Sequence, residues 1–196
     1  MNNIENLSKN KKIAVLISGR GSNLLSLIKN SLNNKFNGSI ELVISDKISA
    51  KGIIYAKKYN IKSHIIDANH NKNKLKFYEK LLDTIKFHNI DIICLAGFMK
   101  ILPDNFIQSF HGPIINIHPS LLPKYKGINT HQRAIDNGDS HAGCTVHHVT
   151  KDLDAGEIII QKSIKIEVNE TVESLSSKVL ELEHQAYSEA LIKIIN

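Results

Sequence analysis

The sequence predicts an α/β domain whose sheet is mostly parallel, with helices on both faces and antiparallel strands toward the C-terminus. Short apolar runs alternate with amphipathic segments along much of the chain, an order typical of parallel strands joined by helices. The first, KKIAVLIS at 11–18, is a short continuous apolar run, as in a strand that is buried on both faces. Right-handed crossovers between such strands place the helices on both sides of one sheet.

The other elements of the parallel part follow in order along the chain. Short apolar runs predict strands at 39–46, 61–67, 90–97 and 113–118. Apolar stripes and capping signals predict helices at 24–32, 50–60, 74–89, 103–110 and 130–139. We expect Ser49 to cap the second of these helices and Pro103 to begin the fourth.

The last part of the chain has a different pattern. Segments 142–150 and 156–166 alternate more in polarity, as strands with one solvated face do. The turn KDLDAG at 151–156 joins them, so this part is expected to be antiparallel. A closing helix is predicted at 171–195.

Length and composition indicate one domain. A chain of 196 residues, 42% of them hydrophobic, can enclose one sizeable core. We expect residues 1–11 to form a polar tail and residues 12–196 to form the domain. The chain has no apolar run long enough to span a membrane and no apolar segment of a secretory signal at its N-terminus. Cys94 and Cys144 lie in apolar runs, so both are expected to be buried free thiols of a cytoplasmic protein.

The formal net charge is +6, which raises the question of a nucleic-acid partner. Arginine occurs only at Arg20 and Arg133, the lysines are spread over the expected helix surfaces, and there is no tryptophan for base stacking. A small anionic substrate accounts for the positive charge equally well. We therefore expect small-molecule substrates and no nucleic-acid partner; no pattern in the sequence fixes an oligomeric state.

The GRGSN turn at 19–23 lies between the first strand and the first helix. Such a turn presents backbone N–H groups and the positive end of a helix to an anion, and its glycines permit the close approach of a phosphate. Ser22 and Asn23 add side-chain donors. Leu24 and Leu25 stand where a dinucleotide-binding fingerprint needs its third glycine, and no Gly-Lys-Ser/Thr follows as in a Walker A loop. The turn indicates a monophosphate site; an ordinary strand-to-helix turn is the alternative.

The segment IINIHPS at 114–120 ends an apolar strand with two polar residues. Side chains at i and i+2 share one face of a strand, so Asn116 and His118 are expected to project together. The carboxyl end of a strand is also where open α/β sheets place their ligand crevices. An imidazole can transfer protons near neutrality, and a carboxamide N–H can stabilise a developing oxyanion. The alternative is a structural, hydrogen-bonded Asn beside a His at the edge of the core.

A catalytic His commonly has a carboxylate that orients it and stabilises its charged form. The turn KDLDAG offers two aspartates. Asp154, flanked by Leu153 and Ala155, suits a carboxylate held over a crevice, whereas Asp152 is expected to face water. Local sequence alone does not bring Asp154 to His118.

Histidine is also a common metal ligand, and ten histidines are present. His147 and His148 are adjacent, so on a strand they face opposite sides and cannot bind one ion. The chain has no Cys-x-x-Cys and no helical His-x-x-x-His. We therefore expect no metal site.

Taken together, five segments resemble the phosphoribosylglycinamide formyltransferase family. They are LISGRGSNL, LAGFMKIL, NIHPSLLPKYKG, AGCTVHHVTKDLDAG and ELEH, and the resemblance covers nearly the whole chain from about residue 12 to the last helix. The Asn-x-His-Pro-Ser-Leu-Leu-Pro motif is specific to enzymes that handle 10-formyltetrahydrofolate. The resemblance implies a single Rossmann-like formyltransferase domain.

The resemblance also implies an activity and a set of site residues. The expected reaction moves the formyl group of 10-formyltetrahydrofolate, the co-substrate, to the glycyl amine of 5-phosphoribosylglycinamide in purine synthesis, without a metal. The implied catalytic residues are Asn116, His118 and Asp154, and the implied substrate-binding residues are Gly21, Ser22, Asn23 and Glu183. The implied folate-binding residues are Met99, Lys100, Ile101, Leu102, Asn116 and Leu153, with Lys74 as the candidate for the glutamate tail.

Three positions depart from the family pattern. Asn129 stands where the family commonly has His, His148 replaces a usual aromatic or apolar residue, and Lys151 replaces a common acidic one. Because none belongs to the catalytic trio, they bear on the details of the pocket and leave the reaction in place.

Three other functions share parts of this pattern. A formyltetrahydrofolate deformylase, which is a hydrolase, has the same Asn/His/Asp trio but normally an extra N-terminal domain. A methionyl-tRNA formyltransferase shares HPSLLP but needs a C-terminal RNA-binding domain. A non-catalytic folate- or phosphate-binding module does not require a His–carboxylate pair. The sequence favours the transferase over all three.

Overall fold

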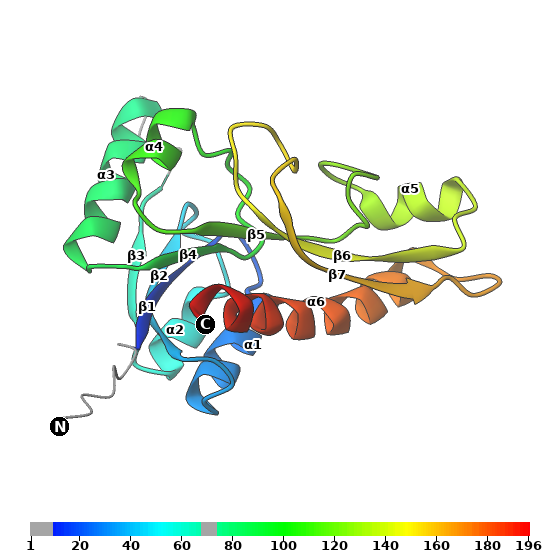
Figure 1. Cartoon of the computed structure of the whole chain (residues 1–196), viewed down its shortest axis with the longest axis horizontal. Coiled ribbons are helices and arrows are strands. Elements are labelled where there is room, and N and C mark those ends of the chain that lie inside the picture. The colour runs from blue at the N-terminus through cyan, green and yellow to red at the C-terminus, as the bar shows by residue number, and fades with distance from the viewer. Residues whose placement is uncertain (1–9, 68–73) are drawn as a thin grey trace, which may run out of the picture.

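The computed structural model of the chain describes residues 10–67 and 74–196, which form one seven-stranded sheet with helices on both faces (Figure 1). The order of the strands in space is β3-β2-β1-β4-β5-β6-β7. Their bounds are β1 Lys11–Ile17, β2 Gly38–Ser45, β3 Lys62–Ile65, β4 Ile92–Leu95, β5 Ile114–His118, β6 His141–His148 and β7 Ile158–Lys165. The Rossmann-like order of strands and helices is confirmed.

The sheet is parallel from β3 to β5 and antiparallel from β5 to β7. A parallel connection needs a crossover of about a dozen residues or more. The segment 149–157 between β6 and β7 is shorter than that and contains no helix, so it can only return the chain in the opposite direction. The prediction of an antiparallel C-terminal part is confirmed.

Two hydrophobic cores lie on opposite faces of the sheet. One core is covered by α1 (Ser22–Leu32), α2 (Ile53–Lys58) and α6 (Val172–Ile195), the other by α3 (Lys74–Phe87) and α4 (Asp104–Ser109). Alternate residues of β1 enter the two cores: Ile13, Val15 and Ile17 the first, Ala14 and Leu16 the second. Burial on both faces explains why this strand is apolar throughout. The helix α5 (Thr130–Asp136) lies beside β6 at the far end of the sheet (Figure 1).

The start of α2 differs from the expected one. Gly52, not Ser49, precedes the helix, and no side chain caps it. The Gly52 N–H donates to the carbonyl oxygen of Gly19 at 2.9 Å. A Cβ atom on Gly21 would lie 2.7 Å from the Cα atom of Gly52. The contact between these two glycine segments sets where α2 begins, which makes the expectation for Ser49 wrong.

The direction in which successive strands are added to the sheet reverses between β3 and β4. From β1 the strands add outward to β2 and β3, and the chain then returns to the other side of β1 as β4 and β5. In open α/β sheets, a ligand crevice forms at such a switch point, beyond the carboxyl ends of the strands. The GRGSN turn, the segment after β4 and the end of β5 all lie at this edge.

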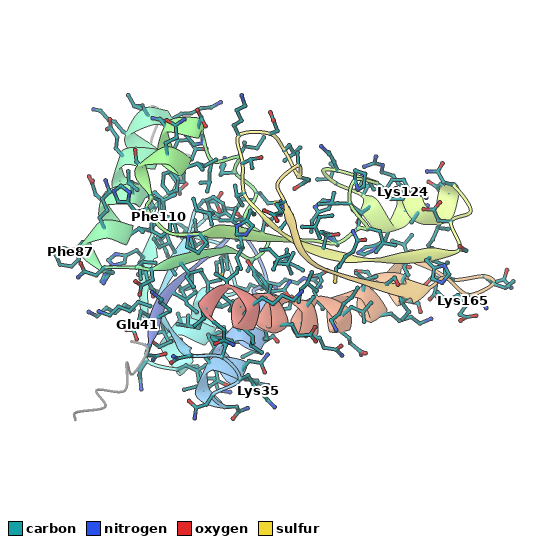
Figure 2. All side chains as sticks on the ribbon, viewed as in Figure 1. Lys35, Glu41, Phe87, Phe110, Lys124 and Lys165 are labelled. Carbon is teal, nitrogen blue, oxygen red and sulfur yellow. The ribbon has the colours of Figure 1, made fainter. Side chains whose placement is uncertain are left out.

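The N-terminal boundary, the two cysteines and the surface lysines have the following places among the described residues. Of the expected tail, residues 1–9 lie outside the described part, and Lys11 already belongs to β1. Cys94 and Cys144 are buried free thiols. Lysines such as Lys35 and Lys165 extend from separate places on the surface (Figure 2). Within residues 10–67 and 74–196, no helix has the length and apolar character to cross a membrane.

Tyr187 fastens α6 to the centre of the sheet. Its side chain is fully buried, and its hydroxyl group donates to the carbonyl oxygen atoms of Leu95 at 2.8 Å and Ile115 at 3.3 Å. We expect Tyr187→Phe to lower the free energy of unfolding by about 1–2 kcal/mol, because two buried acceptors lose a donor. Urea unfolding measures this, with Tyr59→Phe at the end of α2 as the control, expected within about 0.5 kcal/mol of the wild type. Equal stability of the two variants would contradict the anchoring role.

Candidate active site

A cavity of about 440 Å³ lies at the switch-point edge of the sheet. Its walls come from the start of α1, the segment after β4, the end of β5, the loop before α5, the turn between β6 and β7, and α6. Asn116, His118 and Asp154 all line it, as do Asn23 and Glu183. The structure therefore brings residues from distant parts of the sequence into one space.

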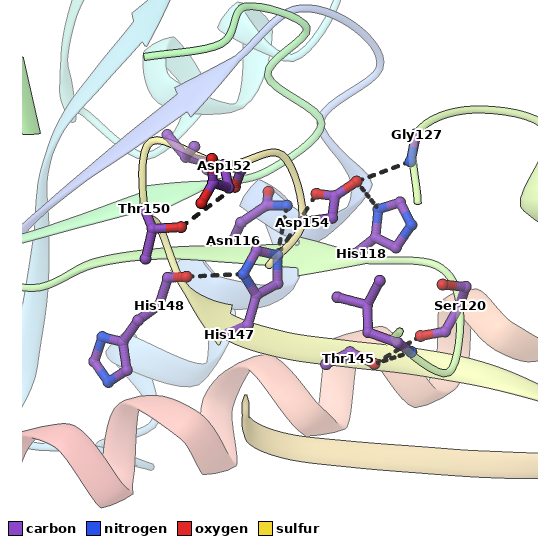
Figure 3. Close-up of polar contacts among 12 residues, drawn as sticks. Asn116, His118, Ser120, Gly127, Thr145, His147, His148, Thr150, Asp152 and Asp154 are labelled. Carbon is purple, nitrogen blue, oxygen red and sulfur yellow. Dashed lines mark hydrogen bonds and ion pairs between the residues drawn. The ribbon is translucent and has the colours of Figure 1, made fainter. Parts of the chain in front are cut away.

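Asn116 and His118 project from the same face of β5 into the cavity, as their spacing predicts (Figure 3). His118 is 5% exposed. Its Nε2 atom lies 2.8 Å from the carbonyl oxygen of Tyr125, and its Nδ1 atom lies 3.4 Å from Oδ2 of Asp154. The imidazole is therefore fixed on both sides, and a buried ring with two acceptors can hold a proton on each nitrogen.

Asp154 is held over the end of β5 by the turn between β6 and β7. The residue has φ 46°, in the left-handed region, and Oδ2 accepts the N–H of Gly127 at 2.9 Å. Burial opposes the ionisation of Asp154, but the interactions with His147, the Gly127 N–H and the charge of His118 together lower the pKa of this carboxyl group. Asp154 is therefore an anion at neutral pH.

His147 is a site residue that the sequence analysis considered only as a metal ligand. It is 2% exposed, and its Nε2 atom lies 3.2 Å from Nδ2 of Asn116 and 3.7 Å from Oδ1 of Asp154 (Figure 3). Its Nδ1 atom lies 2.9 Å from the carbonyl oxygen of His148, an acceptor, which places a hydrogen on Nδ1. The signal that identifies His147 is the pairing of Asn116 with His147 across β5 and β6. Local sequence does not give that register.

The GRGSN turn forms the start of α1. Gly21 has φ 77° and precedes the helix, which begins at Ser22. Asn23 Nδ2 donates to Oε2 of Glu183 at 2.6 Å, and Asn23 Oδ1 is buried without a hydrogen-bond partner among the described residues. Asn23 and Glu183 line the cavity, whereas Gly21 and Ser22, which directly precede Asn23 in the turn, are not lining residues. Burial raises the pKa of Glu183, and the hydrogen bond from Asn23 opposes this rise.

The opposite side of the cavity is apolar and uncovered. Met99, Ile101 and Leu153 line it and are 62%, 60% and 49% exposed. Ile128, which the sequence analysis did not select, joins them at 74% exposure. Large apolar side chains gathered at a cavity mark a binding surface for an apolar group.

Of the other residues expected to bind the folate, two line the cavity and one does not. Lys100 and Leu102 also line the cavity. Lys74 is exposed at the start of α3 and is not a lining residue; the segment 68–73 before it lies outside the described residues.

Within the described part of the chain, no group of three or more His, Cys, Asp or Glu side chains is placed to hold a metal ion.

The buried carboxyl group of Glu183 should make stability depend on pH. Its pKa in the folded protein lies above the ordinary value of 4.5, so folding favours the protonated form. This contribution is present below about pH 4.5 and is lost as the pH rises through the folded-state pKa. Glu183→Gln keeps an acceptor for Asn23 and carries no charge. We expect its free energy of unfolding, relative to the wild type, to increase between about pH 4 and about pH 7.

Urea unfolding at the two pH values tests this expectation. Glu181→Gln, at an exposed position of the same helix, is the matched control and should show no such trend. A relative stability of Glu183→Gln that is constant or falls with pH would contradict it.

Comparison with known proteins identifies relatives of this chain. The family model described as formyl transferase matches residues 11–191. The phosphoribosylglycinamide formyltransferase of Haemophilus influenzae is 42% identical over 177 residues, which cover 90% of this chain and 84% of that protein. The human trifunctional purine biosynthetic protein adenosine-3 is 41% identical over 183 residues, 93% of this chain. The chain spans only 18% of the length of that trifunctional protein.

Solved structures agree with the sequence comparison. The crystal structure of glycinamide ribonucleotide transformylase 1 from Symbiobacterium toebii superimposes with a TM-score of 0.94 at 32% identity. The superposition covers 99% of this chain and 92% of that one. The match in sequence and the match in structure both extend over nearly the whole chain. The chain therefore belongs to the phosphoribosylglycinamide formyltransferase family of formyl transferases.

Proposed function

We propose that this protein transfers the formyl group of 10-formyltetrahydrofolate to the glycyl amine of 5-phosphoribosylglycinamide, a step of purine biosynthesis. One observation carries the proposal: a single cavity joins three chemically different surfaces. These are the polar group around Asn116, His118 and Asp154, the pair of Asn23 and Glu183, and an exposed apolar side. A phosphorylated nucleotide and a folate have different chemistry, and a transferase must bind both next to its catalytic groups.

The reaction requires a proton to move from one nitrogen to another. The glycyl amine attacks the formyl carbon and loses a proton, the bond from the formyl carbon to N10 breaks, and N10 gains a proton. Asn116 carries two hydrogens on Nδ2, so donation toward His147 leaves one for the formyl oxygen as that oxygen gains negative charge. His118 stabilises the same oxyanion and delivers the proton to N10. Asp154 holds His118 in its charged form.

The nucleotide is proposed to bind at the end of the cavity formed by α1. Gly21, Ser22 and Asn23 bind the phosphate at the positive end of this 11-residue helix. Glu183 accepts a hydrogen bond from a ribose hydroxyl group. The buried Oδ1 of Asn23 can only accept and has no partner among the described residues, which supports a ligand with a donor, such as a ribose hydroxyl group, at this end.

The folate is proposed to bind along the apolar side of the cavity. The residues assigned to it are Met99, Lys100, Ile101, Leu102, Asn116 and Leu153. The exposure of the apolar side chains supports this assignment, because a bound aromatic ring would remove them from water. Lys74 stays the candidate for the glutamate tail.

The decisive experiment follows the deformylation of 10-formyltetrahydrofolate with and without 5-phosphoribosylglycinamide. We expect formyl release only with the nucleotide, and one formylated nucleotide for each folate consumed. Release without the nucleotide would identify a hydrolase instead. No turnover in either condition would contradict the proposal.

Variants of the catalytic group extend this test. His118→Ala and Asp154→Asn should each lower kcat by about 100-fold or more. The first variant removes an oxyanion donor, and the second removes the carboxylate that keeps this donor charged and oriented. His111→Ala, at an exposed position before β5, is the control and should retain the wild-type rate. Turnover near normal in both site variants would contradict the assignment of the trio.

The phosphate site makes a different prediction. Ser22→Ala should raise the KM for the phosphorylated substrate by about tenfold, since a hydrogen bond to a charged group contributes about 1.5–3 kcal/mol. The kcat should change little, because this interaction is made equally in the ground state and the transition state. Ser26→Ala, one turn further along α1, is the matched control. An unchanged KM in Ser22→Ala would show that the phosphate binds elsewhere.

A further inference from the structure

The imidazole of His118 lies between two groups that can only accept hydrogen bonds. The carbonyl oxygen of Tyr125 is 2.8 Å from Nε2, and the carboxylate of Asp154 is 3.4 Å from Nδ1. If Nε2 lost its hydrogen, two lone pairs would face each other at 2.8 Å. The same loss at Nδ1 is less costly, because the distance is longer and the Asp154 oxygen already accepts the Gly127 N–H. The neutral ring therefore keeps its hydrogen on Nε2.

The two nitrogens also face different spaces. Asp154, beside Nδ1, lines the substrate cavity. Tyr125, beside Nε2, lines a separate cavity of about 330 Å³ formed with His131 and Ala134. Among the described residues, Tyr125 is not part of the substrate cavity wall. Nδ1 is thus the nitrogen on the side of the reactants.

Tyr125 needs support to keep its carbonyl group at His118. It has φ 56°, a left-handed conformation that is uncommon for a bulky residue. Its hydroxyl group donates to Oδ2 of Asp139 at 2.9 Å and accepts from Nδ2 of Asn137 at 3.0 Å. The guanidinium carbon of Arg133 lies 4.9 Å from the centre of its ring. These contacts hold the side chain from the end of α5, on the side away from the reactants.

Asp139 is the centre of this support. Besides the Tyr125 hydroxyl group, it binds the Nζ atom of Lys124 through both oxygens, at 3.0 and 3.1 Å. Lys124 and Tyr125 are consecutive, so one carboxylate fixes two neighbouring side chains of the loop. The carbonyl oxygen of Lys124 accepts the hydroxyl group of Ser120 at 2.6 Å, which ties the same loop to the end of β5.

We propose that Tyr125 is a positioning residue for formyl transfer: its carbonyl group holds the Nε2 hydrogen of His118, so that Nδ1 carries the transferred proton, and Asp139 keeps Tyr125 in place. In the reaction, Nδ1–H gives its proton to N10 as the bond from N10 to the formyl carbon breaks. The Nδ1 lone pair then takes the proton that the attacking amine loses, which restores the charged ring. The kinetic part of this inference rests on the proposed function, whereas the position of the hydrogen on the neutral His118 ring does not.

Nitrogen NMR of the protein without substrate shows which nitrogen of the neutral His118 ring carries the hydrogen, and so tests this proposal. With His118 assigned by the loss of its signals in His118→Gln, we expect the neutral ring of the wild type to be the Nε2–H form. Tyr125→Phe and Asp139→Asn should both increase the Nδ1–H form, because each loosens the carbonyl group from Nε2. A wild-type ring in the Nδ1–H form would overturn the proposal even if the enzyme is active.

Kinetics of the same variants test the consequence for the reaction. We expect Tyr125→Phe and Asp139→Asn to lower kcat by about tenfold, with both KM values within about twofold, since small misplacements of catalytic groups cost up to about 100-fold. Tyr59→Phe, the same change directly after α2, should match the wild type. Unchanged kcat in both variants, with the wild type active, would overturn the positioning role. A wild type without formyl transfer would instead refute the proposed function and leave the NMR result standing.

Discussion

The buried carboxylate of Asp154 connects the segments that build the active site. A buried charge is costly unless donors and opposite charges surround it. Here the Gly127 N–H and His118 supply them, from the loop before α5 and from β5. The turn that carries Asp154 therefore closes over the end of β5, and the imidazole of His118 is oriented by the same contact that lets Asp154 stay ionised.

The arrangement of the strands explains why the cavity has two chemically different ends. Because strands are added on one side of β1 first and on the other side from β4 onward, a helix N-terminus and an apolar segment meet at the same edge of the sheet. The N-terminus of α1 brings backbone donors and Asn23, whereas the segment after β4 brings Met99 and Ile101. The end of β5 lies between them, so the polar residues of the trio stand where two different ligands can meet.

Most elements of the fold were predicted from sequence patterns that reflect which side chains of a segment are buried. The apolar run at 11–18 predicted a strand covered on both faces, and the two cores divide its side chains between them. The start of α2 did not follow, because it is set by the approach of Gly52 to Gly21, from another part of the chain, and capping preference at Ser49 carries no information about that contact.

For the site, the sequence by itself determined the pair of Asn116 and His118, since a two-residue period places both on one face of a strand. It also singled out Asp154 as a carboxylate suited to a crevice, but only the resemblance to a family joined Asp154 to His118. The tertiary structure alone decided that Asp154 reaches His118, that His147 lies opposite Asn116, and that the carbonyl of Tyr125 holds Nε2. The physical reason is that these contacts depend on strand register and loop path, which residues distant in the sequence fix together.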